Sequence, residues 1–297
     1  MAVNTRILKA EFEYFTPDNF HKALQLLDQY GPDVKVIAGG TDLLIQMKKE
    51  VISPRYLINI MKISDMSFIK VENGWLRIGA ATKWREVVEF CAKDRKYAAL
   101  YEASSSVGKV QVRNMGTVGG NLCTASPAAD SAPALLVFNS RVKLANMQGE
   151  RILNLKDFFK GVNVTAMASN EIMTEIQIPS IQNGMGSAFM KTTRVGADIS
   201  KINCAVAVER QGDLCTSCRI GIGAVAPVPM RIQEAERIVV GKRVDTSLVE
   251  EMGQKAIEEI KPITDIRSTT EYRRQVATIL LKDVFWKAWH RAGGGEG

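Results

Sequence analysis

The sequence lacks several features that would identify a class of protein at once. It has only two histidines, His21 and His290, so a histidine-rich metal or acid–base site is not expected. It contains no run of about 18 or more apolar residues, and therefore no predicted membrane span. Its first residues, Met1 to Arg6, also lack the apolar stretch of a signal peptide. We therefore expect a cytoplasmic protein.

A disulfide framework is missing as well. The five cysteines are odd in number and scattered along the chain, at positions 91, 123, 204, 215 and 218. Only Cys215 and Cys218 are close together, and two thiolates supply half the ligands of a closed metal site. A metal or redox role is one interpretation of this pair. The preferred alternative is two cysteines in a half-buried strand, and no metal is predicted.

The net charge says less about the kind of partner that the protein binds. The formal net charge is +7 and the pI about 9.1, but the cations are spread along the chain. There is no dense basic tract and no aromatic–basic motif typical of RNA binding, so nucleic-acid binding is not predicted. A basic face for an acidic protein partner or for an anionic cofactor explains the charge equally well.

The length of 297 residues predicts two or three subdomains. Alternating helical and strand periods divide the chain into residues 1–60, residues 61–182, residues 183–290 and a flexible tail, 291–297. Strands are expected at 34–38, 56–60, 75–81, 141–145, 171–178, 187–192, 202–209 and 218–224. Helices are expected after a Thr16 cap, at 43–49, after a Thr82 cap, and at 97–107, 230–239, 248–260 and 268–288, the last with a capping box of Ser268 and Glu271.

Two glycine-rich segments carry the chemical information. In the first, the expected strand runs through Val36, Ile37 and Ala38 into Gly39-Gly40-Thr41-Asp42 and then a helix from Leu43. Glycines allow a tight turn and close approach of a ligand, and the amides beside a helix start form an anion-binding nest. A turn of this kind also occurs for geometry alone. It follows neither the dinucleotide-fold nor the P-loop pattern.

The stretch from Gly108 to Pro133 is too long and too rich in glycine for a simple connection, and it contains the second segment, Gln111 to Pro133. It again pairs glycines with polar residues and then adds a carboxylate, Asp130. That carboxylate is suited to the hydroxyls of a ribityl chain, while the alternative is a cap for a helix starting near Ser131. Two separated glycine loops predict an extended dinucleotide lying across a cleft between subdomains.

These motifs together resemble one family. Ala38 to Leu44, Arg113 to Asn121 and Ala125 to Asp130 are similar to the FAD-binding subunit of the xanthine dehydrogenase and carbon monoxide dehydrogenase family. The resemblance continues at 189–194, 197–201, 223–227 and 268–274 and covers nearly the whole chain. It implies an α+β fold: two α/β subdomains of the vanillyl-alcohol oxidase and p-cresol methylhydroxylase (PCMH) type, followed by a C-terminal antiparallel sheet-and-helix domain.

The resemblance also implies roles for residues. The two loops would hold the FAD diphosphate, and Thr124 and Asp130 the ribityl or phosphate region. Val107 would contact the adenine or flavin side, Met173 would pack near the isoalloxazine, and Lys191 would lie near the flavin; otherwise Met173 is a buried strand residue and Lys191 a solvated charge. A loop at 194–201 would be mobile near the flavin. The implied cofactor-binding residues are Val36, Ile37, Ala38, Gly39, Gly40, Thr41, Asp42, Leu43, Val107, Gly116, Thr117, Val118, Gly119, Gly120, Asn121, Thr124, Asp130, Met173 and Lys191.

The family works in assemblies of three polypeptides or domains. The resemblance therefore implies an oxidoreductase subunit that passes electrons from 2Fe–2S clusters of a small partner through FAD to NAD+ or another acceptor. A large partner with the molybdenum cofactor would oxidise the substrate, so no catalytic residue is expected in this chain. Two alternatives are a self-sufficient FAD oxidase of the vanillyl-alcohol type and a flavin-free scaffold protein. No cysteine-rich insertion for a further iron–sulfur cluster is visible.

Overall fold

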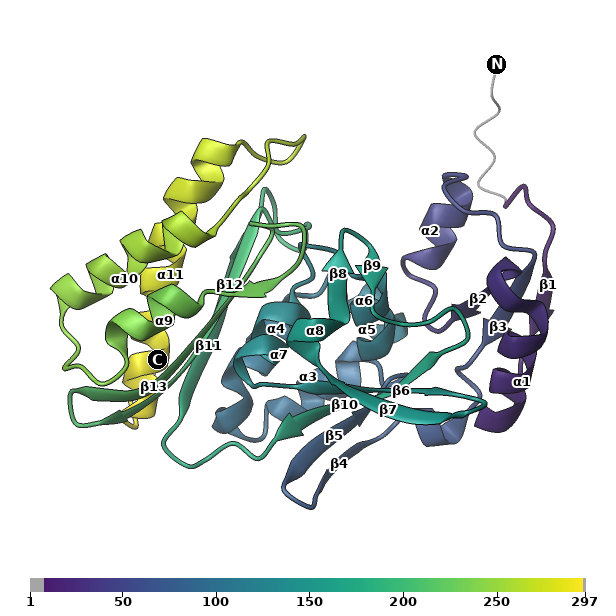
Figure 1. Ribbon diagram of the computed structural model, residues 1–297, viewed down its shortest axis with the longest axis horizontal. Helices are drawn as coiled ribbons and strands as arrows, with labels where there is room; N and C mark the ends of the chain where they lie inside the picture. Colours follow the sequence, from purple (N-terminus) through teal and green to yellow (C-terminus); the bar gives the residue numbers. More distant parts are fainter. Residues whose placement is uncertain (1–7, 296–297) are drawn as a thin grey trace.

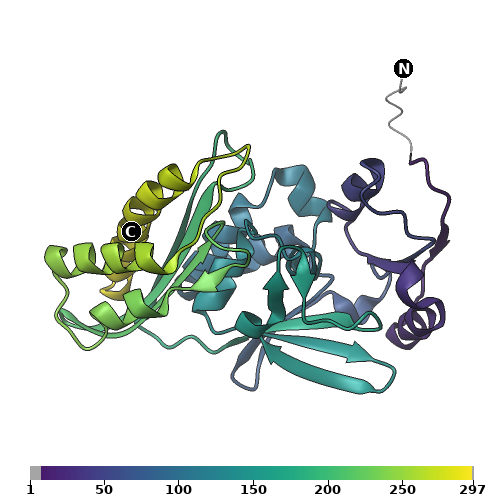
Figure 2. The ribbon, with the colours of Figure 1, turned by 45° about the horizontal axis from the view of Figure 1, so that its top comes forward.

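A computed structural model describes residues 8–295 of the chain. Three larger sheets follow one another along the sequence, and the elements around the first and the last lie at opposite ends of an elongated molecule (Figures 1 and 2). We call them the N-terminal, central and C-terminal sheets. In the described residues no helix is long and apolar enough to cross a membrane.

The N-terminal sheet is parallel and ends at the first glycine turn. Its strand order is β1-β3-β2, so the turn after β2 lies at the carboxyl edge of the sheet, where ligands of α/β units bind. Helix α1 begins at Phe20, because the Asn19 side chain caps it; the predicted Thr16 cap is wrong. The elements are β1 (Glu13–Phe15), α1 (Phe20–Tyr30), η1 (Gly31–Asp33), β2 (Val34–Ile37), α2 (Leu43–Lys48) and β3 (Tyr56–Asn59).

The central sheet has the order β4-β5-β10-β6-β7 and is antiparallel throughout. Its middle strand, β10, comes late in the sequence and pairs with both β5 and β6. The strands are β4 (Ile69–Glu72), β5 (Trp75–Gly79), β6 (Arg141–Asn146), β7 (Gly149–Asn154) and β10 (Ile172–Pro179), with a small separate sheet of β8 (Phe159–Gly161) and β9 (Val164–Thr165).

Helices cover this sheet and occupy most of the second glycine-rich segment. The predicted Thr82 cap is wrong, because its hydroxyl instead bonds the backbone N–H and C=O of Phe68, and Lys83 is the N-cap residue. The helices are η2 (Ser64–Met66), α3 (Trp84–Cys91), η3 (Arg95–Tyr97), α4 (Ala98–Ser106), α5 (Val110–Met115), α6 (Val118–Thr124), α7 (Ser131–Val137) and α8 (Leu155–Phe158).

The C-terminal sheet is an antiparallel meander, β11-β12-β13-β14, with helices α9, α10 and α11 packed on it (Figure 1). Met230 lies in a short strand rather than in the predicted helix, and Thr269 rather than Ser268 caps the last helix. The elements are β11 (Gly186–Thr192), β12 (Ile202–Gln211), β13 (Leu214–Gly223), β14 (Met230–Arg231), α9 (Gln233–Val239), α10 (Thr246–Glu259) and α11 (Thr270–Ala292).

The predicted tail is partly helical. Helix α11 continues to Ala292, so the expectation that residues 291 and 292 belong to a flexible end is wrong. Arg291 is anchored there, since it donates to the Glu102 carboxylate of α4 and to the Ser187 carbonyl. Residues 296 and 297 of the predicted tail lie outside the described residues.

The apolar core is divided in the same way as the sheets. One cluster fills the central region and reaches under α1 through Leu24 and Leu27, while a second lies between the C-terminal sheet and its helices. A small third cluster of Ile37, Met47 and Leu57 supports α2. The glycine turn after β2 therefore rests on packed elements on both sides, which holds its backbone in place.

Candidate functional site

A cleft of about 880 Å³ lies where the three parts of the molecule meet. The N-terminal part contributes the end of β2 and the turn into α2, and the central part contributes α5, α6 and the start of β10. The C-terminal part contributes the loop between β11 and β12. Predicted residues that line the cleft are Val36, Ile37, Ala38, Gly39, Gly40, Thr41, Asp42, Leu43, Val107, Gly116, Thr117, Gly119, Gly120, Asn121, Thr124, Asp130 and Met173.

The turn between β2 and α2 offers free backbone donors to this cleft. Within the described chain, the amides of Gly39, Gly40 and Thr41 have no recorded hydrogen-bond acceptor. Backbone amides are strong donors that need a partner, so consecutive unpaired amides form a nest for an anion. Gly40 has φ +69°, a left-handed conformation that glycine adopts without strain.

Gly39 is required for a different reason. A Cβ atom there would lie 1.9 Å from the carbonyl oxygen of Met115, so any side chain would push the two glycine segments apart. The hydroxyl of Thr41 also lies beside Gly116. The two predicted loops are thus in direct contact.

The second glycine segment does not present a nest of amides. The N–H of Val118 donates to Thr82 O at 3.0 Å, that of Gly119 to Ala80 O at 2.9 Å, and that of Gly120 to the Thr117 hydroxyl at 3.1 Å. A Cβ at Gly119 would lie 2.6 Å from the Ala80 Cβ, so this glycine serves packing against the end of β5. These three amides are therefore paired within the chain, and a role of this loop in holding a diphosphate stays a prediction. Val118 is buried and does not line the cleft.

Asp42 and Thr124 connect the two walls. The Thr124 hydroxyl lies 3.5 Å from the Asp42 carboxylate and also donates to Gly120 O at 2.9 Å. Burial raises the pKa of Asp42 although part of the residue still reaches solvent, and the hydrogen bond from Thr124 acts in the opposite direction. An anion held beside this carboxylate would favour its protonated form further.

Asp130 is at the centre of a buried polar network. Its carboxylate accepts from Lys191 Nζ at 2.7 Å, from the Ser200 hydroxyl at 2.5 Å and from Asn203 Nδ2 at 3.0 Å. The residue stands at the N-cap position of α7, yet its side chain makes no capping hydrogen bond, so the helix-cap interpretation is wrong. Asp130 is also one of the residues that line the cleft.

Lys191 is not a solvated charge. Only 11% of its side chain is exposed, and besides Asp130 its ammonium donates to Ser106 O at 2.8 Å and Asp198 O at 3.3 Å. Lys191 does not itself line the cleft; its partners Asp130 and Asp198 do. The pair joins β11 to the central part and anchors the loop after β11, whose residues Ala197 to Ile199 form one wall.

The remaining walls of the cleft are formed mainly by apolar or small residues. Met173 is buried in β10 and Val107 follows α4, and both reach the cleft. Many further residues line the cleft that were not among the predicted cofactor-binding positions. A few lie inside the glycine-rich segments, and the others carry no local mark and are brought here only by packing. They are Leu27, Val34, Lys35, Gln46, Val51, Ile52, Ile60, Ala80, Trp84, Gly108, Val112, Cys123, Ser126, Ala128, Ala129, Asn163, Thr165, Met167, Ala168, Ser169, Glu171 and Ile172.

The cysteines differ in their surroundings: a hydrogen bond from Cys218 lowers the pKa of Cys215, whereas burial raises that of Cys204. Burial raises the pKa of Cys123, in the cleft wall, to about 12. Cys215 and Cys218 are the buried positions in the part of β13 where buried and more exposed residues alternate, as expected for a half-buried strand. In the described part of the chain, no group of three or more His, Cys, Asp or Glu side chains is placed to hold a metal ion.

The geometry fits an extended anionic dinucleotide. The unpaired amides at residues 39–41 suit a diphosphate, and the apolar walls on either side suit aromatic rings. Residues 10–181 match the family of the FAD binding domain in molybdopterin dehydrogenase, and residues 187–288 match the CO dehydrogenase flavoprotein C-terminal domain. The first match covers more than half of the chain, so the protein belongs to this family of FAD-binding oxidoreductase subunits. The predicted resemblance, the α+β fold class and FAD as cofactor are confirmed.

Individual relatives extend over the whole chain. The glyceraldehyde dehydrogenase medium chain of Sulfolobus acidocaldarius is 30% identical over 275 residues, covering 93% of this chain and 97% of the relative. The carbon monoxide dehydrogenase of Hydrogenophaga pseudoflava, solved without the Mo-pyranopterin moiety of its cofactor, superposes with a TM-score of 0.93 at 30% identity, covering 96% and 99%. Quinoline 2-oxidoreductase of Pseudomonas putida 86 gives a TM-score of 0.88 at 27% identity, covering 95% and 97%.

Proposed function

We propose that this chain is an electron-transfer subunit that holds one FAD noncovalently in the cleft. In this proposal the turn from Val36 to Leu43 binds the diphosphate, and Gly116 to Asn121 shape the opposite wall. Thr124 and Asp130 hold the ribityl or phosphate region, and Val107 and Met173 contact the rings. Lys191 contributes indirectly, by holding the Asp130 carboxylate in position. The observation that supports this assignment is the row of unpaired amides at Gly39, Gly40 and Thr41.

The chain's own contribution is binding and orientation. Bound FAD would supply the conversion between one-electron and two-electron transfer. Neither histidine lines the cleft, and two of its carboxylates are ion-paired: Asp130 with Lys191, and Glu171, which accepts from Arg151 at 2.6 Å. These groups are held in fixed ion pairs, which suits a site that positions a cofactor rather than one that transfers protons to a substrate.

The relatives support a heteromeric assembly. Several are medium chains or FAD subunits of dehydrogenases, such as the xanthine dehydrogenase FAD-binding subunit of Escherichia coli O157:H7, 29% identical over 284 residues. We propose a large partner with the molybdenum cofactor, a small partner with two 2Fe–2S clusters, and NAD+ or another acceptor, in the cytoplasm. We also propose that residues 1–60, 61–182 and 183–290 are the structural units of the chain.

Anaerobic stopped-flow absorbance of the flavin tests this function. The isolated, FAD-loaded subunit should accept electrons from a chemical reductant and remain oxidised with xanthine, carbon monoxide or nicotinate. Adding the molybdenum and iron–sulfur subunits should make the flavin bleach with the substrate of the complex. Rapid reduction of the lone subunit by an organic substrate would favour the self-sufficient oxidase, and a purified subunit unable to bind FAD would favour the scaffold.

A further inference from the structure

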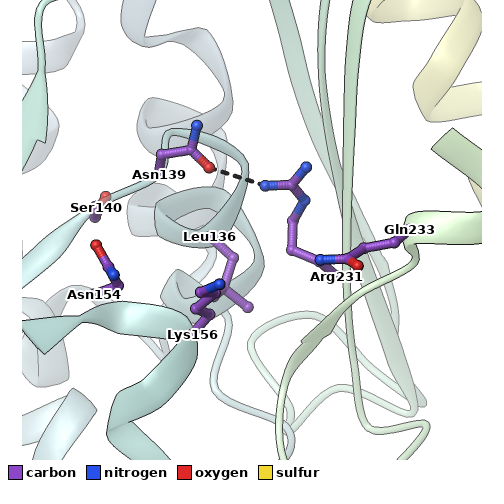
Figure 3. A pocket seen from close by; sticks show the side chains of 7 residues that line it. All are labelled: Leu136, Asn139, Ser140, Asn154, Lys156, Arg231 and Gln233. Carbon is purple, nitrogen blue, oxygen red and sulfur yellow. Dashed lines mark hydrogen bonds between the residues drawn. The ribbon is translucent and has the colours of Figure 1, made fainter. Parts of the chain in front are cut away.

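A second, smaller cavity of about 260 Å³ lies away from the flavin cleft, between the central part and the C-terminal sheet (Figure 3). Asn139 follows α7, and Asn154 and Lys156 stand at the start of α8. Arg231 of β14 and Gln233 of α9 come from the other side. None of these residues belongs to the flavin cleft.

The two sides are already joined by one hydrogen bond. Arg231 Nη1 donates to Asn139 Oδ1 at 2.9 Å, shown as the dashed line in Figure 3. Because the Asn139 oxygen is used, its amide NH2 remains as a donor. Two further guanidinium nitrogens bind Glu236 at 2.5 and 2.6 Å, so Arg231 is held rigidly in place.

Three other lining side chains have no recorded partner in the described structure. Asn154 occupies the N-cap position of α8 without making a capping hydrogen bond. Neither the Lys156 ammonium nor the Gln233 amide has a recorded hydrogen bond or ion pair. No carboxylate is among the residues that line the cavity, although Glu236 binds the Arg231 guanidinium.

We propose that this cavity binds a small oxyanion, a phosphate or a carboxylate group. Ammonium, guanidinium and amide N–H groups are the donors that recognise such oxygens, and the Lys156 charge is not neutralised by a partner. The bound group would be contacted from both the α7–α8 side and the β14–α9 side. Binding would therefore stabilise the docking of the C-terminal sheet on the central part.

Titration of inorganic phosphate against thermal unfolding tests the proposal. The full chain is used with saturating FAD, so that phosphate cannot act in the flavin cleft. Sodium chloride at equal ionic strength controls for screening. Lys156 is itself exposed, so Lys156→Met should weaken phosphate binding roughly two- to fivefold, the range for an exposed ion pair. Lys156→Arg should restore it, and Lys160→Met, an exposed lysine outside the cavity, should leave it unchanged.

A parallel titration with acetate distinguishes a phosphate ligand from a carboxylate ligand. Stronger stabilisation by phosphate assigns the site to a phosphate group, and equal stabilisation by acetate assigns it to a carboxylate. Phosphate that stabilises no more than chloride overturns the proposal, as does an equal response of the Lys156→Met and Lys160→Met proteins. FAD content stays constant in all variants, so failure here leaves the flavin assignment unaffected.

Discussion

At the scale of single residues, the glycines of the cleft differ in what they do. Gly39 and Gly119 have no room for a side chain because the chain itself packs against them. Gly40 instead has a positive φ, and the atoms nearest to a Cβ there belong to the side chains of Leu44 and Ile37, at 3.1 and 3.3 Å. Gly40 is therefore the position at which a substitution reports most directly on the cofactor.

We expect Gly40→Ala to lose most of its FAD while remaining folded. Backbone strain alone should cost about 1 kcal/mol. Gly212→Ala is the matched control, because Gly212 has φ +56° and open surroundings in the distant β12–β13 turn. Both variants should be slightly less stable, and only Gly40→Ala should lose flavin absorbance after gel filtration. Equal flavin content in the two would contradict the diphosphate assignment.

The Asp130–Lys191 pair should contribute to both stability and flavin binding. Asp130→Ala leaves a buried ammonium without its partner, so we expect a loss of about 3–5 kcal/mol in the free energy of unfolding. The double variant with Lys191→Met should lose less than the sum of the single effects. FAD binding should weaken by roughly 1–3 kcal/mol. An unchanged FAD dissociation constant would restrict Asp130 to a structural role.

At the scale of elements, Glu102 connects three of them. Its carboxylate on α4 accepts from Arg291 at 2.7 Å and Lys287 at 2.9 Å on α11, and from the Phe189 N–H of β11 at 2.7 Å. Burial alone would raise the pKa of Glu102, but these donors, Arg291 first, hold it below its ordinary value.

A depressed carboxylate pKa gives stability a defined pH dependence. The Glu102 contribution is complete above the unfolded pKa, near 4.5, and is lost as the pH falls through the lower folded value. Glu102→Gln should be less stable at neutral pH, and its stability should decline less steeply below about pH 4.5. Urea unfolding between pH 3 and 7 measures this. Parallel pH profiles for both proteins would show that the carboxylate charge is not involved.

Strand β13 contains the two neighbouring cysteines, Cys215 and Cys218. Both side chains are buried, and in the described residues no third ligand accompanies them. We therefore expect the Cys215→Ser/Cys218→Ser protein to contain as little iron and zinc as the unsubstituted subunit, by elemental analysis. Stoichiometric metal that disappears in the double variant would reverse this conclusion.

At the scale of the whole molecule, the cleft is bounded by all three parts. A ligand that binds only the folded cleft stabilises it by mass action, by about 2.7 kcal/mol at a free concentration of 100 times the Kd. The melting temperature should therefore rise with added FAD and fall after flavin removal. FMN, which lacks the adenylate half, should stabilise less at equal concentration. A melting temperature independent of FAD would argue against a cofactor between these parts.

The sequence by itself determined the family, the α+β class and the first glycine turn. Local patterns sufficed because Val36 to Leu43 is one continuous strand, turn and helix, whose backbone conformation follows from Gly39, Gly40 and the apolar residues around them. Most of the expected strands also appeared within a few residues, since two-residue periodicity is read locally.

The tertiary structure decided what the local pattern could not. Residues 108–133 looked like a glycine loop, but packing on β5 makes much of this segment helical and consumes the amides of Val118 and Gly119. Lys191 and Asp130 are 61 residues apart, and neither side chain indicates its partner in the sequence. Long-range contacts of this kind depend on how the sheets dock, because only the docked fold excludes water from an ion pair. Within residues 8–295 the same fold leaves the amides of Gly39, Gly40 and Thr41 without an acceptor.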